Sequence, residues 1–192
     1  MGYIKGSTIA CVPRLRRIAG VRRRAGIIDG YFDIRPAKNY EVIIADMNGE
    51  LLKSICEELR RYYSARCRVV KLSRDKAWRL RIYGKELVLG IHEIAQQRLQ
   101  QPNETLLEAA IDAEGTVTRG FNQPVRIRIT QKRGMKAEAI RAVLEELSVP
   151  YLTVRRRGGY VEFVISGRDN VKLLLTKIRV RHPDKVSKLS DL

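Results

Sequence analysis

Hydrophobic and polar residues follow two regular spacings along the chain, and the same order of spacings occurs twice. Apolar residues alternate with polar ones over residues 40–46 and again over 125–131. Each run is followed by apolar residues at helical spacing, over 48–63 in the first case and over 134–147 in the second. Alternation predicts strands with one buried face, and the helical spacing predicts amphipathic helices. The chain is therefore expected to contain one structural unit in two copies.

The remaining elements repeat in the same order. Two further strand patterns follow each long helix, and a final helix begins after Gly84 in the first copy and after Gly167 in the second. The other strands are expected at 31–36, 65–73 and 77–84, and at 116–119, 150–157 and 160–167. Because a short apolar helix opens each copy, the unit is αββαββα and the fold class is α+β.

The two opening helices are rich in small residues and end in acidic ones. They read RAGIIDGYF and LEAAIDAEG, over residues 24–32 and 107–115. Alignment of Asp29 with Asp112 places Tyr31 on Glu114. On this alignment the second copy keeps two acids and the first copy has a phenol in place of one of them.

These two segments resemble the nine-residue motif of the LAGLIDADG homing-endonuclease family. The resemblance covers nearly everything from about residue 20 to residue 185. It implies two tandem units that pack through their motif helices, with the internal pseudo-twofold symmetry of a single-chain monomer. It also implies that the two sheets form a concave basic saddle over a nucleic-acid duplex. Small residues in both helices, namely Gly26, Gly30, Ala109 and Ala113, suit close packing of helix backbones.

The resemblance assigns roles at the ends of these elements. The eighth motif residue is an acid in both copies of the family, and the two acids hold divalent ions. Glu114 is therefore the expected catalytic and metal-binding residue, whereas Tyr31 marks a degenerate first motif. The family also places a polar residue near the metal at the end of the second strand, which is Gln131 here. Its counterpart Asp46 suits either a water-positioning role or, as favoured by the Asn48-Gly49 step, a turn.

Net charge points to a polyanionic partner. The chain has 38 Lys and Arg against 21 Asp and Glu, which gives +17 and an isoelectric point near 10.2. Lys and Arg that neutralise phosphates release counterions and add sequence-independent affinity. Basic or polar residues on strands are the expected nucleic-acid contacts: Arg66, Arg68, Arg79, Arg81, Arg126, Arg128, Thr130, Lys132, Arg155 and Arg157, together with Arg22 and Arg23 before the first motif.

Domain boundaries and the cellular setting follow from the same patterns. We expect a basic N-terminal arm at 1–17, a first repeat at 18–98, a linker at 99–105 and a second repeat at 106–192. No segment has the length and apolar content of a membrane span, and no signal peptide is evident. The three cysteines, Cys11, Cys56 and Cys67, show no paired framework, so a cytoplasmic protein with reduced thiols is expected.

The missing acid decides the functional expectation. With Tyr31 on Glu114, the sequence favours a nuclease-dead protein that binds nucleic acid without a cofactor. A structured RNA, of which ribosomal RNA is one, is favoured weakly over duplex DNA. The alternative is a magnesium-dependent, site-specific DNA homing endonuclease or a nickase.

Overall fold

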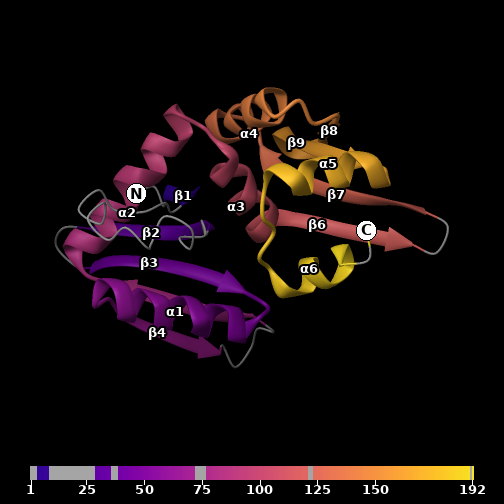
Figure 1. Ribbon diagram of the computed structural model, residues 1–192. Helices are drawn as coiled ribbons and strands as arrows, with labels where there is room; N and C mark the ends of the chain where they lie inside the picture. Colours follow the sequence, from indigo (N-terminus) through magenta and orange to yellow (C-terminus); the bar gives the residue numbers. More distant parts are fainter. Residues whose placement is uncertain (1–3, 9–28, 36–38, 72–76, 121–122, 191) are drawn as a thin grey trace. The chain divides into compact units, whose positions relative to one another are not determined.

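The computed structural model describes residues 4–8, 29–35, 39–71, 77–120, 123–190 and 192 (Figure 1). The chain divides into two compact units, residues 1–96 and 97–192. Each unit has one antiparallel sheet together with helices, which confirms the α+β class and the repeated unit.

The first unit contains a five-stranded sheet in the order β1-β2-β3-β5-β4. Its elements are β1 (Ile4–Thr8), β2 (Asp29–Arg35), β3 (Asn39–Asp46), α1 (Gly49–Tyr63), β4 (Arg66–Lys71), β5 (Trp78–Tyr83) and α2 (Lys85–Gln100). The strand β1 was not expected. It lies within the predicted arm and pairs with β2, so part of that segment belongs to the sheet. Residues 9–17, with the other half of the predicted arm, lie outside the described residues.

The second unit contains a four-stranded sheet in the order β6-β7-β9-β8. Its elements are α3 (Glu104–Glu114), β6 (Gly115–Gly120), β7 (Gln123–Lys132), α4 (Met135–Glu146), β8 (Leu152–Arg156), the 3-10 turn η3 (Arg157–Gly159), β9 (Tyr160–Ser166), α5 (Arg168–Lys177) and α6 (Pro183–Leu189). Only three residues separate α2 from α3. Because Gln, Arg and Leu are good helix formers, α2 continues to Gln100 and stops just before Pro102.

One face of each sheet is buried under helices, as the alternation predicted. In the first unit Val42, Ile44, Leu80 and Ile82 pack with α1 and α2 side chains such as Leu52 and Val88. In the second unit Ile127, Ile129, Phe163 and Ile165 form the core with α3, α4 and α5. Figure 1 shows α1 over β4, and α4 and α5 over β7 and β9. The face of each sheet turned away from these helices is called its open face below.

The segment after α5 holds the end of α3. The carboxylate of Asp112 accepts hydrogen bonds from the backbone N–H groups of Arg181, at 2.9 Å, and His182, at 3.0 Å. The Nζ of Lys185 donates to the carbonyl oxygens of Ile111, at 2.7 Å, and Asp112, at 2.5 Å. These contacts satisfy carbonyl groups that a helix C-terminus leaves open. Asp112 therefore has a structural role at the end of α3.

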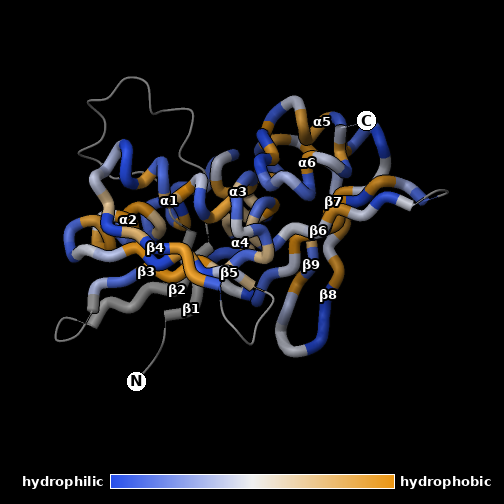
Figure 2. The backbone as a smooth tube through the Cα atoms, turned by 90° about the horizontal axis from the view of Figure 1, so that it is seen from below, coloured by the Kyte–Doolittle hydropathy of each residue, from blue (hydrophilic) through white to orange (hydrophobic). Residues whose placement is uncertain are grey.

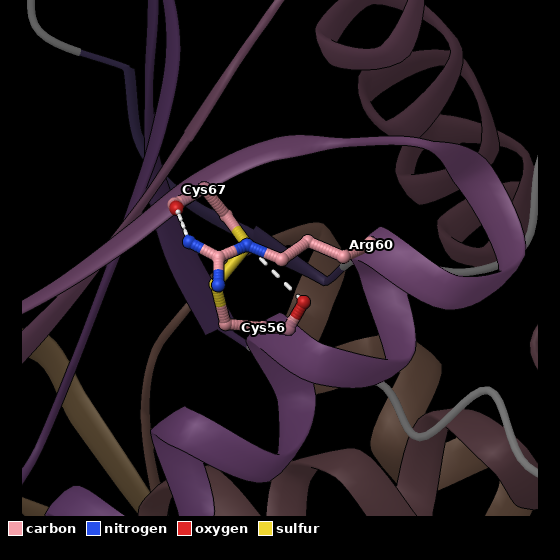
Figure 3. The surroundings of a disulfide bond; sticks show 3 residues. All are labelled: Cys56, Arg60 and Cys67. Carbon is pink, nitrogen blue, oxygen red and sulfur yellow. Dashed lines mark hydrogen bonds between the residues drawn. A yellow bond between two sulfur atoms is a disulfide. The ribbon is translucent and has the colours of Figure 1, made fainter.

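The expectation of reduced thiols is wrong for two cysteines. Cys56 in α1 and Cys67 in β4 form a disulfide, with their Cα atoms 5.9 Å apart. They are 11 residues apart in sequence, and the turn after α1 brings them together in the first core. Arg60 closes the same corner, because its Nη2 donates to the Cys67 carbonyl oxygen at 2.7 Å (Figure 3). Cys11 lies outside the described residues.

Removal of this disulfide lowers the stability of the first unit. Loop closure of this length contributes about 2–3 kcal/mol in the chain-entropy model. The double variant Cys56→Ser and Cys67→Ser should therefore unfold at lower denaturant concentration than the wild type under non-reducing conditions. A reducing agent should lower the wild-type midpoint and leave that of the variant unchanged, and Cys11→Ser is the control. A wild-type midpoint that does not respond to reductant would contradict the cross-link.

Candidate functional site

One backbone hydrogen bond occurs in both units, and it shows which residues of the two units correspond. The N–H of Gly84 donates to the carbonyl of Tyr40 at 3.3 Å, and the N–H of Gly167 donates to that of Val125 at 3.0 Å. Both glycines have positive φ, +122° and +97°. Gly84 immediately precedes α2, and Gly167 immediately precedes α5. Tyr40 therefore corresponds to Val125. From this position the buried residues of β3 and β7 also correspond in pairs: Val42 with Ile127, and Ile44 with Ile129.

Strand register carries this correspondence to the motifs. Tyr31 pairs with Ile43, which is three residues after Tyr40. Thr116 pairs with Arg128, which is three residues after Val125. Tyr31 thus occupies the position of Thr116. Counting back along the chain from Tyr31 and Thr116, Gly30 corresponds to Gly115 and Asp29 corresponds to Glu114.

The correspondence from the strand register therefore differs from the sequence alignment of the motifs by two residues. It matched Asp29 with Asp112, whereas the register matches Asp29 with Glu114. The difference lies in where the strand begins. In the second unit α3 runs to Glu114 and β6 starts at Gly115, whereas in the first unit β2 already starts at Asp29. On this register Tyr31 lies inside the strand β2. The position of Glu114 in the second unit is then occupied by Asp29 in the first, so both units have an acid there.

Glu114 ends α3 next to the first turn of α4. Its carboxylate forms an ion pair with the Nζ of Lys136 at 3.1 Å. The Glu114 side chain is 35% exposed and that of Lys136 is 14% exposed, so water reaches the acid more readily than the amine. Lys136 is the second residue of α4, and the second residue of α1 is Glu50. The first turn of α1 thus has an acid at the position where the first turn of α4 has a lysine.

Gln131 and Asp46, which end the second strands of the two predicted repeats, also differ in their hydrogen bonds. Gln131 is buried in β7, and its Nε2 has no hydrogen-bond partner among the described residues. A buried amide donor left in this way is costly, so it suits a water. Asp46 instead accepts from the N–H of Asn48 at 2.7 Å, and Asn48 caps α1 by accepting from the N–H of Leu51 at 3.0 Å. The turn role of Asp46 is confirmed.

Basic side chains gather on the open face of the second unit. Arg126 and Arg128 are half-buried on β7, between the exposed Thr116 and Thr118 of β6 and the residues of β9. Thr130 and Lys132 follow on the same face and are exposed. Arginines at alternate positions of one strand repel each other, so the face favours an anion.

The outer strand β8 corrects one part of the prediction. Arg155 pairs with Val161, a core residue, and therefore belongs to the helix-covered side of the sheet. Arg157 begins the turn η3. Arg156 lies on the open face instead and forms an ion pair with the buried Glu162 of β9. Sequence reasoning missed Arg156, although the register of β8 on β9 would have identified it.

The open face of the first unit has its charge on β4 and β5. Arg68 of β4 pairs with Arg81 of β5. Arg66 lies two residues before Arg68 on β4, and Arg79 lies two residues before Arg81 on β5, so the two flank this pair on the same face. All four side chains are exposed. Arg81 also neutralises Glu41, with its Nε 2.7 Å from the Oε1 of that buried carboxylate. The four arginines predicted from the sequence are thus brought together, whereas Arg22 and Arg23 lie outside the described residues.

Metal ligands do not cluster within the described part of the chain. No group of three or more His, Cys, Asp and Glu residues in it could hold a metal ion.

The described helices also include none that is long and apolar enough to cross a membrane.

The resemblance noted in the sequence extends to a family model. Residues 102–179 match the model of the LAGLIDADG-like domain. This segment is therefore similar to a LAGLIDADG-like domain. It spans α3 to α5, and thus includes Glu114, Gln131 and the basic strand β7. No curated protein sequence matches the chain.

Solved structures of LAGLIDADG proteins share the fold of the whole chain. I-DmoI in complex with DNA and Ca has a TM-score of 0.61 and 21% identity, over 80% of this chain and 84% of that one. Full-length DUF199/WhiA from Thermatoga maritima has a TM-score of 0.56 and 11% identity, over 84% of this chain. The chain spans 55% of the length of that protein. At these identities the likeness establishes the LAGLIDADG fold, and the predicted family resemblance is confirmed.

Proposed function

We propose that this LAGLIDADG-like protein binds duplex DNA through its two open faces and cleaves it with divalent metal, using Asp29 and Glu114 as the acids. The observation that carries the proposal is the shared register position of Tyr31 and Thr116, because a count of two residues back from each reaches Asp29 and Glu114. The nuclease-dead hypothesis depended on Tyr31 standing in place of an acid. Because Tyr31 corresponds to Thr116, that reason for loss of cleavage no longer applies.

Sheet geometry favours duplex DNA over RNA. The major groove of B-form DNA is about 12 Å wide and admits two β-strands, so side chains on an open sheet can reach base edges. The major groove of A-form RNA is deep and narrow and does not admit them. Exposed arginines on β4 and β5 and half-buried ones on β7 are suited to guanine edges and phosphates. I-DmoI, whose fold is similar, has been solved with DNA together with Mn or Ca.

The donors of this chain fit a magnesium ion. Mg²⁺ keeps several waters and binds through one or two carboxylates and substrate phosphates, so it does not need a cluster of three protein ligands. The partly exposed carboxylate of Glu114 is such a hard oxygen donor in the second unit. When bound, the ion polarises the scissile phosphate and makes water a stronger nucleophile.

Neighbouring side chains complete the proposed site of the second unit. Lys136 forms an ion pair with Glu114 and adds positive charge where phosphate arrives. The amide of Gln131 is buried at the end of β7, on the helix-covered side, and its unpartnered Nε2 is assigned to a water. Binding itself needs only the arginines of the open faces.

Two arginines on β7 test the binding face. The double change Arg126→Gln and Arg128→Gln should weaken duplex binding at least tenfold, since each bidentate contact to a base is worth about 1–3 kcal/mol. The measurement is fluorescence anisotropy with a duplex selected from a random library, titrated at several salt concentrations. Arg155→Gln is the matched control and should leave affinity nearly unchanged, because Arg155 lies on the other side of the sheet.

The same assay decides between the two nucleic acids. Structured RNA, the partner favoured by the sequence, should bind more weakly than the selected duplex at equal salt. Tighter binding to RNA, or equal losses from the Arg155 variant and the β7 variant, would contradict the proposal.

A further inference from the structure

One row of residues across the second open face changes from basic to apolar. Strand pairing joins Thr116 to Arg128, Arg128 to Val164, and Val164 to Leu152. Leu152 is 66% exposed, and Val164 is partly exposed beside it. Val154 lies next along β8 on the same face and is also partly exposed. The hairpin of β8 and β9 contains both hydrophobic and hydrophilic residues in Figure 2.

The corresponding row of the first unit has the opposite order. It joins Tyr31 to Ile43, Ile43 to Arg81, and Arg81 to Arg68. Arginine therefore occupies this row on β5 and β4 of the first sheet, where β9 and β8 of the second sheet have valine and leucine. An isolated exposed leucine is ordinary on a soluble protein. Leu152, however, lies in one row with Arg128, on a face that also has Arg126 and Arg156. A face of this composition suits a ligand with both polar and apolar groups.

The major groove of DNA offers this combination. Guanine presents two acceptors to an arginine, and thymine presents its 5-methyl group to apolar side chains. Neighbouring strands lie about 4.8 Å apart, so Leu152 is about 10 Å from Arg128 across the sheet. At about 3.4 Å per base step, this distance corresponds to about three base pairs.

We infer that the second open face recognises thymine methyl groups through Leu152 and Val164, about three base pairs from a base bound by Arg128. This inference rests on the proposed binding of duplex DNA and names the bases that one half-site contains. It also gives the protein a direct means of distinguishing DNA from RNA, since uracil lacks the methyl group. In the first unit the same row has Arg81 and Arg68 on β5 and β4 in place of this apolar pair.

Replacement of thymine by uracil tests the inference. A duplex is first selected from a random library with the full-length wild-type protein, and each thymine of the selected site is then exchanged for deoxyuridine. Loss of one contacted methyl group should weaken wild-type binding about fourfold, as expected for burial of one methylene equivalent. The double variant Leu152→Ala and Val164→Ala should bind thymine and uracil duplexes equally. Leu173→Ala changes an exposed leucine of α5 and should keep the wild-type discrimination.

The outcomes separate this inference from the function on which it rests. If the wild-type protein selects a duplex but binds its uracil form equally well, the methyl contact is refuted and DNA binding stands. If discrimination persists in the double variant, another surface recognises the methyl group and the assignment fails. If no duplex sequence is enriched, both the inference and the proposed sequence-specific DNA binding are refuted. Circular dichroism of each variant shows that an altered affinity does not come from unfolding.

Discussion

Glu114→Gln and Asp29→Asn should each reduce magnesium-dependent cleavage of the selected duplex by at least about a thousandfold, because metal coordination contributes several kcal/mol to such reactions. Both changes keep the size of the side chain and remove its charge. Duplex binding should change little, since the arginines of the open faces supply it. Cleavage is measured on an end-labelled duplex, with each strand labelled in turn.

Tyr31 is the decisive control for this prediction. Tyr31→Phe should leave cleavage unchanged, because this residue corresponds to Thr116 in the strand register. The alignment of Tyr31 with Glu114 predicts instead that the wild type is inactive and that Tyr31→Asp restores cleavage. Activity that appears only in Tyr31→Asp, with no effect of Asp29→Asn, would show that the register does not identify the functional acid.

Asp112→Ala should destabilise the second unit by about 2–3 kcal/mol. The Asp112 carboxylate accepts hydrogen bonds from the N–H groups of Arg181 and His182, and bonds to a charged partner contribute about 1.5–3 kcal/mol each. The estimate lies below the sum of two such bonds because Asp112 is partly exposed. Loss of these bonds frees the segment after α5 from the end of α3. The measurement is denaturant unfolding of the full chain.

A second acid nearby provides the matched control for this change. Asp184 is exposed in the first turn of α6, so Asp184→Ala should cost less than about 1 kcal/mol, the usual size of a helix-dipole contribution. Asp112→Asn keeps one acceptor oxygen and should have an intermediate effect. Equal losses from Asp112→Ala and Asp184→Ala would contradict the role given to Asp112.

Hydrophobic alternation predicted the sheets well because each sheet has one buried face. In β7 the residues Ile127 and Ile129 are buried, and Arg126 and Arg128 lie on the other side, as their alternation indicated. The strand β8 shows where this reasoning stops. A change of one residue in register moves every side chain to the opposite face. Arg155 and Arg156 are adjacent in sequence, so only the pairing with β9 shows which of them lies on the open face.

The motif alignment differs from the strand register for a related reason. Two similar sequences can begin a strand at different motif positions, and matching letters cannot detect the shift. Asp29 and Asp112 look alike in sequence, yet Asp29 begins a strand and Asp112 lies inside a helix. The pairing of Cys56 with Cys67 likewise depends on how the turn after α1 folds. Short elements such as β1 and α6 escape prediction because they contain too few residues to show a period.

The most direct test of DNA binding is to crosslink the protein in its native cells, purify it under denaturing conditions and sequence the attached nucleic acid. Our account predicts recovery of one or a few duplex DNA sites, and loss of that recovery in the double variant Arg126→Gln and Arg128→Gln. Recovery of a single position in ribosomal RNA or another structured RNA, with no enrichment of DNA, would contradict it.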